Sequence, residues 1–287
     1  MSSRAEEQIR AEIVEVGRRL YARAYIASND GNISVRLDAD RIIATPRGVS
    51  KGFMTADMMV IVNGEGHKVA GERDASTELP MHLEIYDQRP DVQAVVHAHP
   101  PLATGFAVAG IPLTRAVLAE VVTTLGSIPI AAYGTPSTEE LPAAVRKYIK
   151  AHDGMLLANH GAVTCGNGLL QAYYKMETIE HFAKISLVAR LLGREHLLSR
   201  EEVDRLEGIR DTYGTTATAP FCAEPALGGG AESPDAQALC QVLEAPTSAT
   251  ERLVPDVPQP ASKDGEIRLT YDELTDLVAD AIRHLRD

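Results

Sequence analysis

The sequence contains few of the residues that mark several classes of protein. It has no tryptophan, its aromatic content is 5%, and its three cysteines are Cys165, Cys222 and Cys240. An odd number of widely spaced cysteines indicates neither a disulfide framework nor a cysteine zinc site. Because aromatic side chains are so few, we expect a core built mainly from Ala, Val, Ile and Leu.

Basic residues and long apolar runs are also scarce. The 28 Lys and Arg residues face 40 Asp and Glu residues, which gives a formal charge of −12, whereas nucleic-acid-binding proteins usually carry a basic patch. No apolar run approaches the roughly 18 residues of a membrane span. Charged side chains interrupt the first twenty residues, unlike a secretory signal. We therefore expect no nucleic-acid partner, no membrane partner and a cytoplasmic location.

The composition changes along the chain and predicts three regions. Over residues 1–214, amphipathic helical patterns alternate with short strand-like runs, which indicates a single α/β domain. Ala, Pro, Gly, Thr and Ser dominate residues 215–264, which favours a flexible linker. Within residues 265–287, a capping-box pattern at Thr270 and Glu273 precedes an apolar stripe and predicts a short amphipathic helix.

Three histidines follow predicted strands. His97 and His99 lie at the end of a strand predicted over residues 92–98, and their two-residue spacing puts both imidazoles on one face. His160 follows a strand predicted over residues 155–158 and is a third ligand if the two strands are neighbours. Imidazole ligands suit zinc, and three protein ligands with one open position are typical of a catalytic site. The alternative is that all three are hydrogen-bonded strand-end residues without a metal.

Polar residues at turns and at one helix start predict an anion pocket. Glu78 begins a helix predicted over residues 77–88, where a carboxylate either stabilises the helix dipole or acts as an acid/base beside a metal. Glycine turns and helix N-termini can direct N–H groups at a phosphate, although each is also an ordinary turn by itself. The residues concerned are Gly31, Asn32, Arg47, Gly48, Ser76 and Thr77.

Five motifs in a fixed order carry a family resemblance. They are GNIS at 31–34, TPRG at 45–48, STE at 76–78, AVVHAHPP at 94–101 and NHGAVTCG at 159–166. Over residues 6–214 the chain resembles the class II aldolase/adducin family, and within it the L-fuculose-1-phosphate aldolase-like enzymes. This resemblance implies a three-layer α/β/α fold with a mainly antiparallel central sheet, and a homotetramer with active sites at subunit interfaces.

The resemblance also implies roles for residues at matching positions. His97, His99 and His160 would bind Zn²⁺, with Glu78 as a displaceable fourth ligand and the acid/base. Tyr213 matches a C-terminal tyrosine that reaches the active site. The substrate phosphate would be held by Asn32, Gly48, Ser76 and Thr77, with Gly31 and Arg47 in the same loops.

The implied reaction is the reversible cleavage of a ketose 1-phosphate to dihydroxyacetone phosphate and an aldehyde through a zinc-stabilised enediolate. Two departures stand out. The segment from Leu113 to Gly126 lacks the tyrosine of the aldolases, so that Glu120, Thr123 or Tyr213 alone would have to take its role. Arg47 replaces a phosphate-loop threonine of the aldolases. Because a guanidinium can pair with a phosphate or a carboxylate, an acidic substrate is also compatible with the sequence.

Other functions remain open at this stage. The same fold hosts sugar-phosphate 4-epimerases, dehydratases and decarboxylases. A non-catalytic adducin-like interaction module is an alternative of another class, but it is expected to lack the metal histidines. The helix predicted at 265–287 resembles the encapsulation peptides of bacterial microcompartment cargo, which implies a shell-protein partner and a location inside such a compartment. Alternatively, it packs on its own domain or on a neighbouring subunit.

Overall fold

The sheet at the centre of the fold has eight strands in the order β4-β3-β2-β1-β5-β8-β7-β6. The computed structural model describes residues 3–213, so the predicted linker and C-terminal helix lie outside the described residues. All neighbouring strands are antiparallel except β6 and β7. The strands are β1 (Asn32–Arg36), β2 (Arg41–Ala44), β3 (Val60–Asn63), β4 (Lys68–Ala70), β5 (Ala94–Ala98), β6 (Ile130–Ala131), β7 (Gly154–Leu157) and β8 (Gly161–Gly166).

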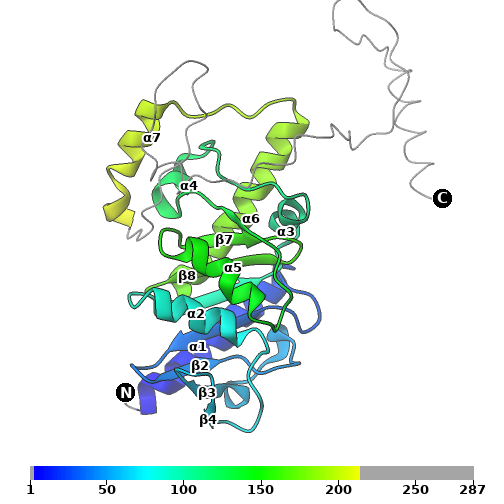
Figure 1. Ribbon diagram of the computed structural model, residues 1–287, viewed down its shortest axis with the longest axis vertical. Coiled ribbons are helices and arrows are strands. Elements are labelled where there is room, and N and C mark those ends of the chain that lie inside the picture. The colour runs from blue at the N-terminus through cyan, green and yellow to red at the C-terminus, as the bar shows by residue number, and fades with distance from the viewer. Residues whose placement is uncertain (1–2, 214–287) are drawn as a thin grey trace, which may run out of the picture. The chain divides into compact units, whose positions relative to one another are not determined.

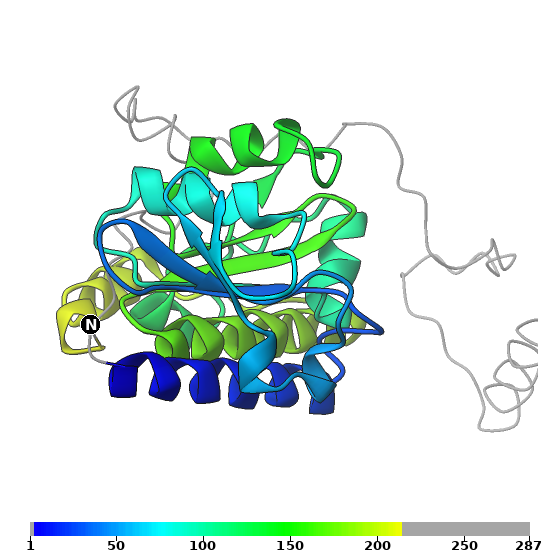
Figure 2. The same ribbon diagram turned by 90° about the horizontal axis from the view of Figure 1, so that it is seen from below.

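Helices cover both faces of this sheet, which makes three layers (Figures 1 and 2). One face carries α1 (Ser3–Ala22), α3 (Pro101–Val108), α4 (Ala119–Thr124) and α6 (Leu169–Leu191), and the other carries α2 (Leu79–Gln88) and α5 (Glu140–Ile149). The remaining helical segments are η1 (Lys51–Phe53), η2 (Ala56–Met58), α7 (Arg200–Glu207) and η3 (Arg210–Tyr213). Among residues 3–213, no helix is long and apolar enough to cross a bilayer. The predicted α/β/α fold with a mainly antiparallel sheet is confirmed.

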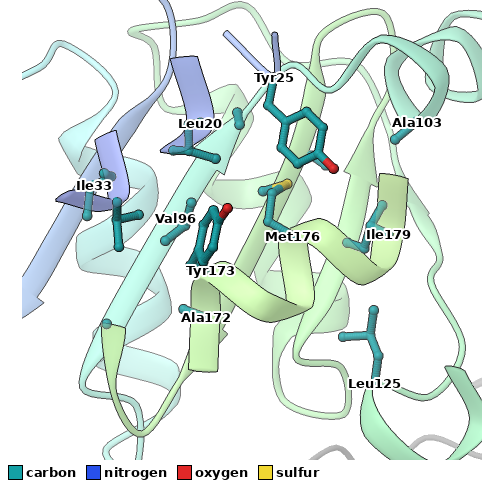
Figure 3. Packing of buried hydrophobic residues seen from close by; sticks show 14 of the residues in the cluster. Leu20, Tyr25, Ile33, Val96, Ala103, Leu125, Ala172, Tyr173, Met176 and Ile179 are labelled. Atoms are coloured by element: carbon teal, nitrogen blue, oxygen red, sulfur yellow. The ribbon is translucent and has the colours of Figure 1, made fainter. Parts of the chain in front are cut away.

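Alternation along the central strands divides the core into two layers. On β1 and β5, Ile33 and Val96 point toward α1 and α6, where they pack near Tyr173 and Met176 (Figure 3). Val95 points to the opposite face and packs under α2 and α5. Because side chains in a strand alternate with a period of two, the polar residues between these apolar ones all face α2. The sheet therefore presents one row of polar side chains to that helix.

Several element boundaries differ from the sequence prediction. The strand β8 follows β7 after a three-residue turn, although the sequence was interpreted there only as a turn motif. The sequence pattern predicts Ser137 as a helix cap, but Ser137 does not cap α5, because it has a left-handed backbone (φ +67°) and the helix begins at Glu140. The pattern also predicts Ser199 as the cap of a helix from Glu201 to Tyr213, and a reciprocal capping box with Glu202 confirms the cap. That helix ends at Glu207, and η3 covers the last residues.

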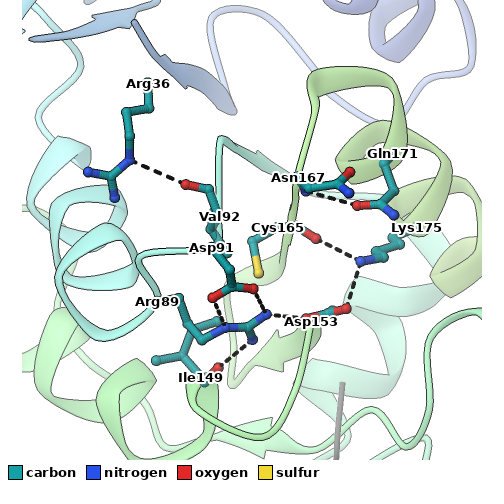
Figure 4. Close-up of polar contacts among 10 residues, drawn as sticks. All are labelled: Arg36, Arg89, Asp91, Val92, Ile149, Asp153, Cys165, Asn167, Gln171 and Lys175. Atoms are coloured by element: carbon teal, nitrogen blue, oxygen red, sulfur yellow. Dashed lines mark hydrogen bonds and ion pairs between the residues drawn. The ribbon is translucent and has the colours of Figure 1, made fainter. Parts of the chain in front are cut away.

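A buried ionic cluster ties α6 and the end of α2 to β7 (Figure 4). Asp153 is completely buried, and its carboxylate accepts hydrogen bonds from Lys175 at 2.7 Å and from Arg89 at 3.0 Å. Arg89 also donates two hydrogen bonds to Asp91 and one to the carbonyl of Ile149. Each buried charge thus has an opposite charge within hydrogen-bond distance, as buried ions require.

A histidine of α2 contacts the row of polar side chains under this helix, and we expect it to destabilise the fold in acid. His82 Nδ1 lies 2.7 Å from Ser34 Oγ, which also contacts the Tyr86 hydroxyl at 2.9 Å. Burial lowers the pKa of His82 to about 4. In the unfolded chain the imidazole titrates near 6.5. Between about pH 6.5 and about 4 the unfolded state therefore binds more protons, and the free energy of unfolding falls as the pH falls through this window.

This effect is measurable against a His82→Gln variant. We expect the titration of His82 to lower the free energy of unfolding by about 2–3 kcal/mol between pH 7 and pH 4, since one pKa unit corresponds to about 1.4 kcal/mol. Urea unfolding of both proteins at several pH values, with a chelator present throughout, gives the two slopes. The variant should show the smaller loss, and equal slopes would show that His82 does not titrate as its burial predicts.

Candidate metal centre

The ends of neighbouring strands and the start of α2 bring the three histidines and Glu78 together at one end of the sheet. On β5, His97 pairs with Asn32 of β1, and His99 follows one residue past the end of the strand. His160 lies in the turn between β7 and β8. Glu78 is the N-cap residue of α2, which packs above this end of the sheet. The three histidines and Glu78, from three segments distant in the sequence, thus meet at one point.

The strand arrangement corrects the assumption behind the prediction of His160. The strands β5 and β7 are not neighbours, because β8 lies between them and pairs with both. The tight turn returns His160 to the end of β5. Gly161 permits this approach, since a Cβ there would lie 2.5 Å from the carbonyl oxygen of Ala98 and 2.6 Å from the ring of His99. Any side chain at position 161 would force the turn away from the cluster.

The imidazole nitrogens converge on a small volume. His99 Nε2 lies 3.1 Å from His97 Nε2, and the ring centroids of the three histidines are 4.8 to 5.0 Å apart. Glu78 lies beside the histidines: its Oε1 is 3.0 Å from His160 Nε2, and its Oε2 is 3.4 Å from His97 Nε2. Their potential ligand atoms are therefore close enough to share a single ion.

The tautomer of His97 fits this donor set. His97 Nδ1 lies 2.9 Å from the carbonyl oxygen of Ala162, which can only accept, so Nδ1 carries the hydrogen and Nε2 presents a lone pair to the cluster. Burial lowers the pKa of His97 well below its ordinary value, and burial followed by the charge of His160 lowers that of His99. Neutral imidazoles with a carboxylate beside them are what zinc-type cations bind.

The carboxylate of Glu78 is held in its ionised form. Burial raises the pKa of Glu78, but His97, His160 and a 2.7 Å hydrogen bond from Asn32 Nδ2 together bring the pKa below its ordinary range. At neutral pH this side chain is therefore an anionic ligand. Asn32 reaches it because it lies on the α2 side of β1.

Asp30 lies beside the cluster and was not among the predicted site residues. Its Oδ2 lies 3.5 Å from His99 Nδ1, on the side of the ring away from His97. A carboxylate in this position orients a metal-binding imidazole and raises its basicity. The only sequence signal was its place directly before Gly31 and Asn32, which is not enough to separate it from an ordinary turn residue.

The segments predicted to bind phosphate lie side by side next to Asn32. Pro46 and Ala75 form an isolated bridge, and the Ser76 N–H donates to the carbonyl of Thr45. The side chain of Arg47 is exposed. Gly48 has a left-handed backbone (φ +71°), and a Cβ there would meet nothing within 4 Å. The two loops thus form an open-sided cradle, and its binding of phosphate stays a prediction.

The candidates for the missing tyrosine are not placed at the cluster. Thr123 is buried and its hydroxyl donates to the carbonyls of Ala119 and Glu120 within α4. Glu120 lines a separate cavity of about 920 Å³ with Arg23, Tyr25 and residues of α3, α4 and α6, and none of the three histidines borders it. The side chain of Tyr213 lies outside the described residues.

Comparison with known proteins gives matches over most of the described chain. The profile of the class II aldolase and adducin N-terminal domain matches residues 11–187. An L-fuculose phosphate aldolase of Methanococcus maripaludis is 33% identical over 177 residues, covering 62% of this chain and 95% of that protein. A 3-oxo-tetronate 4-phosphate decarboxylase of Pectobacterium atrosepticum is 31% identical over 188 residues, covering 64% and 86%. A solved L-fuculose 1-phosphate aldolase superposes with a TM-score of 0.66 at 30% identity, covering 72% and 96%.

Proposed function

Because the chain belongs to the class II aldolase and adducin family, we propose that it is a zinc-dependent lyase that cleaves a ketose 1-phosphate to dihydroxyacetone phosphate and an aldehyde. The observation that carries this proposal is the convergence of His97, His99 and His160 on the carboxylate of Glu78. A non-catalytic module has no need for neutral imidazoles buried around a carboxylate, so we do not propose one.

The residues of the cluster divide the chemistry between them. A divalent cation held by the three histidines supplies a Lewis acid for the negative charge that develops on substrate oxygens as the C3–C4 bond breaks. Glu78 is the group that carries the proton at the nucleophilic carbon, C3 of the ketose. Asn32 fixes one oxygen of Glu78 by its 2.7 Å hydrogen bond and so directs the carboxylate to that carbon.

The cradle beside Asn32 would hold the phosphate. In this proposal the backbone N–H groups of Gly48 and Thr77 donate to phosphate oxygens, and the side chains of Ser76 and Thr77 add hydroxyl donors. The exposed guanidinium of Arg47 would pair with a second anionic group of the substrate or with the phosphate itself. The loops thereby place the reacting carbons near Glu78.

Decarboxylation of a phosphorylated 3-oxo acid is the second candidate. It is favoured by the similarity to the Pectobacterium decarboxylase, by the absence of tyrosine from 113–126 and by Arg47, whose guanidinium suits a carboxylate. Loss of carbon dioxide leaves negative charge on the same type of oxygen as the aldol cleavage, so the cluster serves either reaction.

Metal content and product formation, measured on one sample, test the proposal. We expect about one zinc per chain, with dihydroxyacetone phosphate formed from ketose 1-phosphates such as L-fuculose 1-phosphate. His97→Ala and His160→Ala should lose the metal, and the exposed His67→Ala should keep it as a control. Zinc with carbon dioxide released from a 3-oxo acid phosphate would establish the second candidate. Absence of bound metal after reconstitution would contradict both reactions.

The partners remain predictions. The family resemblance leads us to propose a homotetramer in the cytoplasm. The sequence pattern at residues 265–287 leads us to propose a microcompartment shell protein as a further partner. The homotetramer concerns contacts between chains, and the shell-protein partner concerns residues outside the described part of the chain.

A further inference from the structure

A buried lysine joins the Gly48 loop of the proposed phosphate cradle to the loop that leads into Asn32. Lys51 begins η1, directly after the turn that contains Gly48, and only 2% of it is exposed. Its Nζ donates a 2.6 Å hydrogen bond to the carbonyl of Asn29 and a 3.1 Å hydrogen bond to the carbonyl of Val49. Asn29 belongs to the loop that leads into Asn32, so a single ammonium group connects both loops.

The position of Lys51 is fixed by helix α1. A Cβ on Gly17 would lie 2.8 Å from the carbonyl oxygen of Lys51 and 3.2 Å from its Cβ, so the helix carries a glycine where the lysine backbone passes. The backbone of Lys51 is therefore held close against α1. From this position its ammonium group reaches the two loop carbonyls.

Connecting two carbonyls does not by itself require a charge. Burial of an ammonium group costs several kcal/mol, and a neutral amide side chain donates hydrogen bonds to carbonyls without that cost. Burial lowers the pKa of Lys51 to about 8, while Asp30 and Glu78 act to raise it. The group is thus mostly protonated at neutral pH and lies within electrostatic reach of two carboxylates of the metal centre. Among residues 3–213 it has two acceptors for its three N–H groups.

We propose that Lys51 is a positioning residue that holds the Gly48 loop of the cradle against the loop before Asn32 and supplies the fixed positive charge for the phosphate dianion of the substrate. The inference rests on the proposed function, because it takes the cradle to be the phosphate site. The dianion would offset the cost of burying the ammonium, and the clamped loops would present their N–H groups without reorganisation on binding. Lys51 makes no contact with the reacting carbons and acts through the loops and through its charge.

Two variants separate the charge from the clamp. Lys51→Met has a similar unbranched length and no charge, so we expect it to fold and to keep its zinc. Lys51→Gln keeps an N–H donor for the carbonyls but removes the charge. The exposed Lys147→Met of α5 is the matched control. The probes are inorganic phosphate, by calorimetric titration of the zinc-loaded protein, and a ketose 1-phosphate, by steady-state kinetics.

Both Lys51 variants should bind phosphate at least about tenfold more weakly and raise KM by a similar factor, the equivalent of about 1.4 kcal/mol. The value of kcat should change by less than about threefold, and Lys147→Met should match the wild type. Unchanged phosphate affinity in Lys51→Met would overturn the proposal. Phosphate affinity lost in Lys51→Met but retained in Lys51→Gln would also overturn the proposal, because hydrogen bonds to the loops would then be sufficient without the charge. A wild type that binds no phosphate would overturn it as well.

The outcome is separable from that of the proposed function. If the wild type binds phosphate through Lys51 but cleaves no ketose phosphate, the role of Lys51 stands and the proposed reaction fails. If the wild type cleaves a ketose phosphate with a KM that Lys51→Met leaves unchanged, the reaction stands and the role of Lys51 fails.

Discussion

Replacing Glu78 with Gln should lower kcat by a factor of about 10²–10⁴, the usual contribution of a positioned acid/base, while the zinc content stays unchanged. Glutamine has the same shape and still accepts the hydrogen bond from Asn32, but it cannot carry a proton. The three histidines remain to hold the metal. Zinc content and kcat on the same preparation of each protein give the comparison.

A partial reaction isolates the step that Glu78 performs. In D₂O the wild type should exchange a C3 hydrogen of dihydroxyacetone phosphate without any aldehyde present, and the Glu78→Gln variant should not. Glu84→Gln, in the same helix, is the matched control, because Glu84 pairs with Arg146 at the surface, away from the cluster. A Glu78→Gln variant with normal exchange and normal kcat would leave Glu78 only the role of a helix-dipole or metal partner.

Replacing Asp153 with Ala should cost about 3–5 kcal/mol of the free energy of unfolding, as expected when one partner of a buried ion pair is removed. Lys175 then loses its carboxylate partner while remaining 4% exposed, with the carbonyl of Cys165 still accepting from it. Arg89 is affected less, because Asp91 still pairs with it. Urea unfolding of the two proteins under identical metal conditions measures the difference.

A double variant shows whether the unpaired charge is the cause. Asp153→Ala combined with Lys175→Met removes both charges, and we expect it to be more stable than Asp153→Ala alone. As a control, Glu15→Ala breaks exposed ion pairs with Arg18 and Arg19 and should cost less than about 1 kcal/mol. If Asp153→Ala costs no more than Glu15→Ala, the cluster does not stabilise the fold through its charges.

The sequence predicted the clustered residues of the candidate metal centre better than the residues that contact this cluster. His97 and His99 were placed on one face because strand periodicity alone decides this, and the structure confirms that placement. Glu78 was placed at a helix start, which is also observed. Asp30 and Lys51 were missed because their side chains act across turns, and no local pattern distinguishes such residues from solvent-exposed ones.

His160 lies in the predicted cluster, although it reaches the cluster by a different arrangement from the one that the sequence suggested. The sequence required two strands to be neighbours, but β8 separates them and a hairpin turn brings the histidine back. The pairing partner of a strand depends on contacts between distant segments, which a periodicity does not encode. Within one chain, Glu120 lines a separate cavity and the Thr123 hydroxyl bonds within its own helix, because the way α4 packs decides where their side chains lie.

The features that the sequence determined depend on local interactions, and those that the structure decided depend on non-local ones. The sequence alone determined the alternation of helices and strands, the shared face of His97 and His99, the helix cap at Ser199 and the family motifs, since each depends on residues a few positions apart. The tertiary structure decided the strand order, the meeting of three histidines with Glu78, the lone pair of His97 and the clamp formed by Lys51. These depend on burial and on contacts between segments 20 to 80 residues apart, where the free energy of packing selects one arrangement among many that local preferences allow.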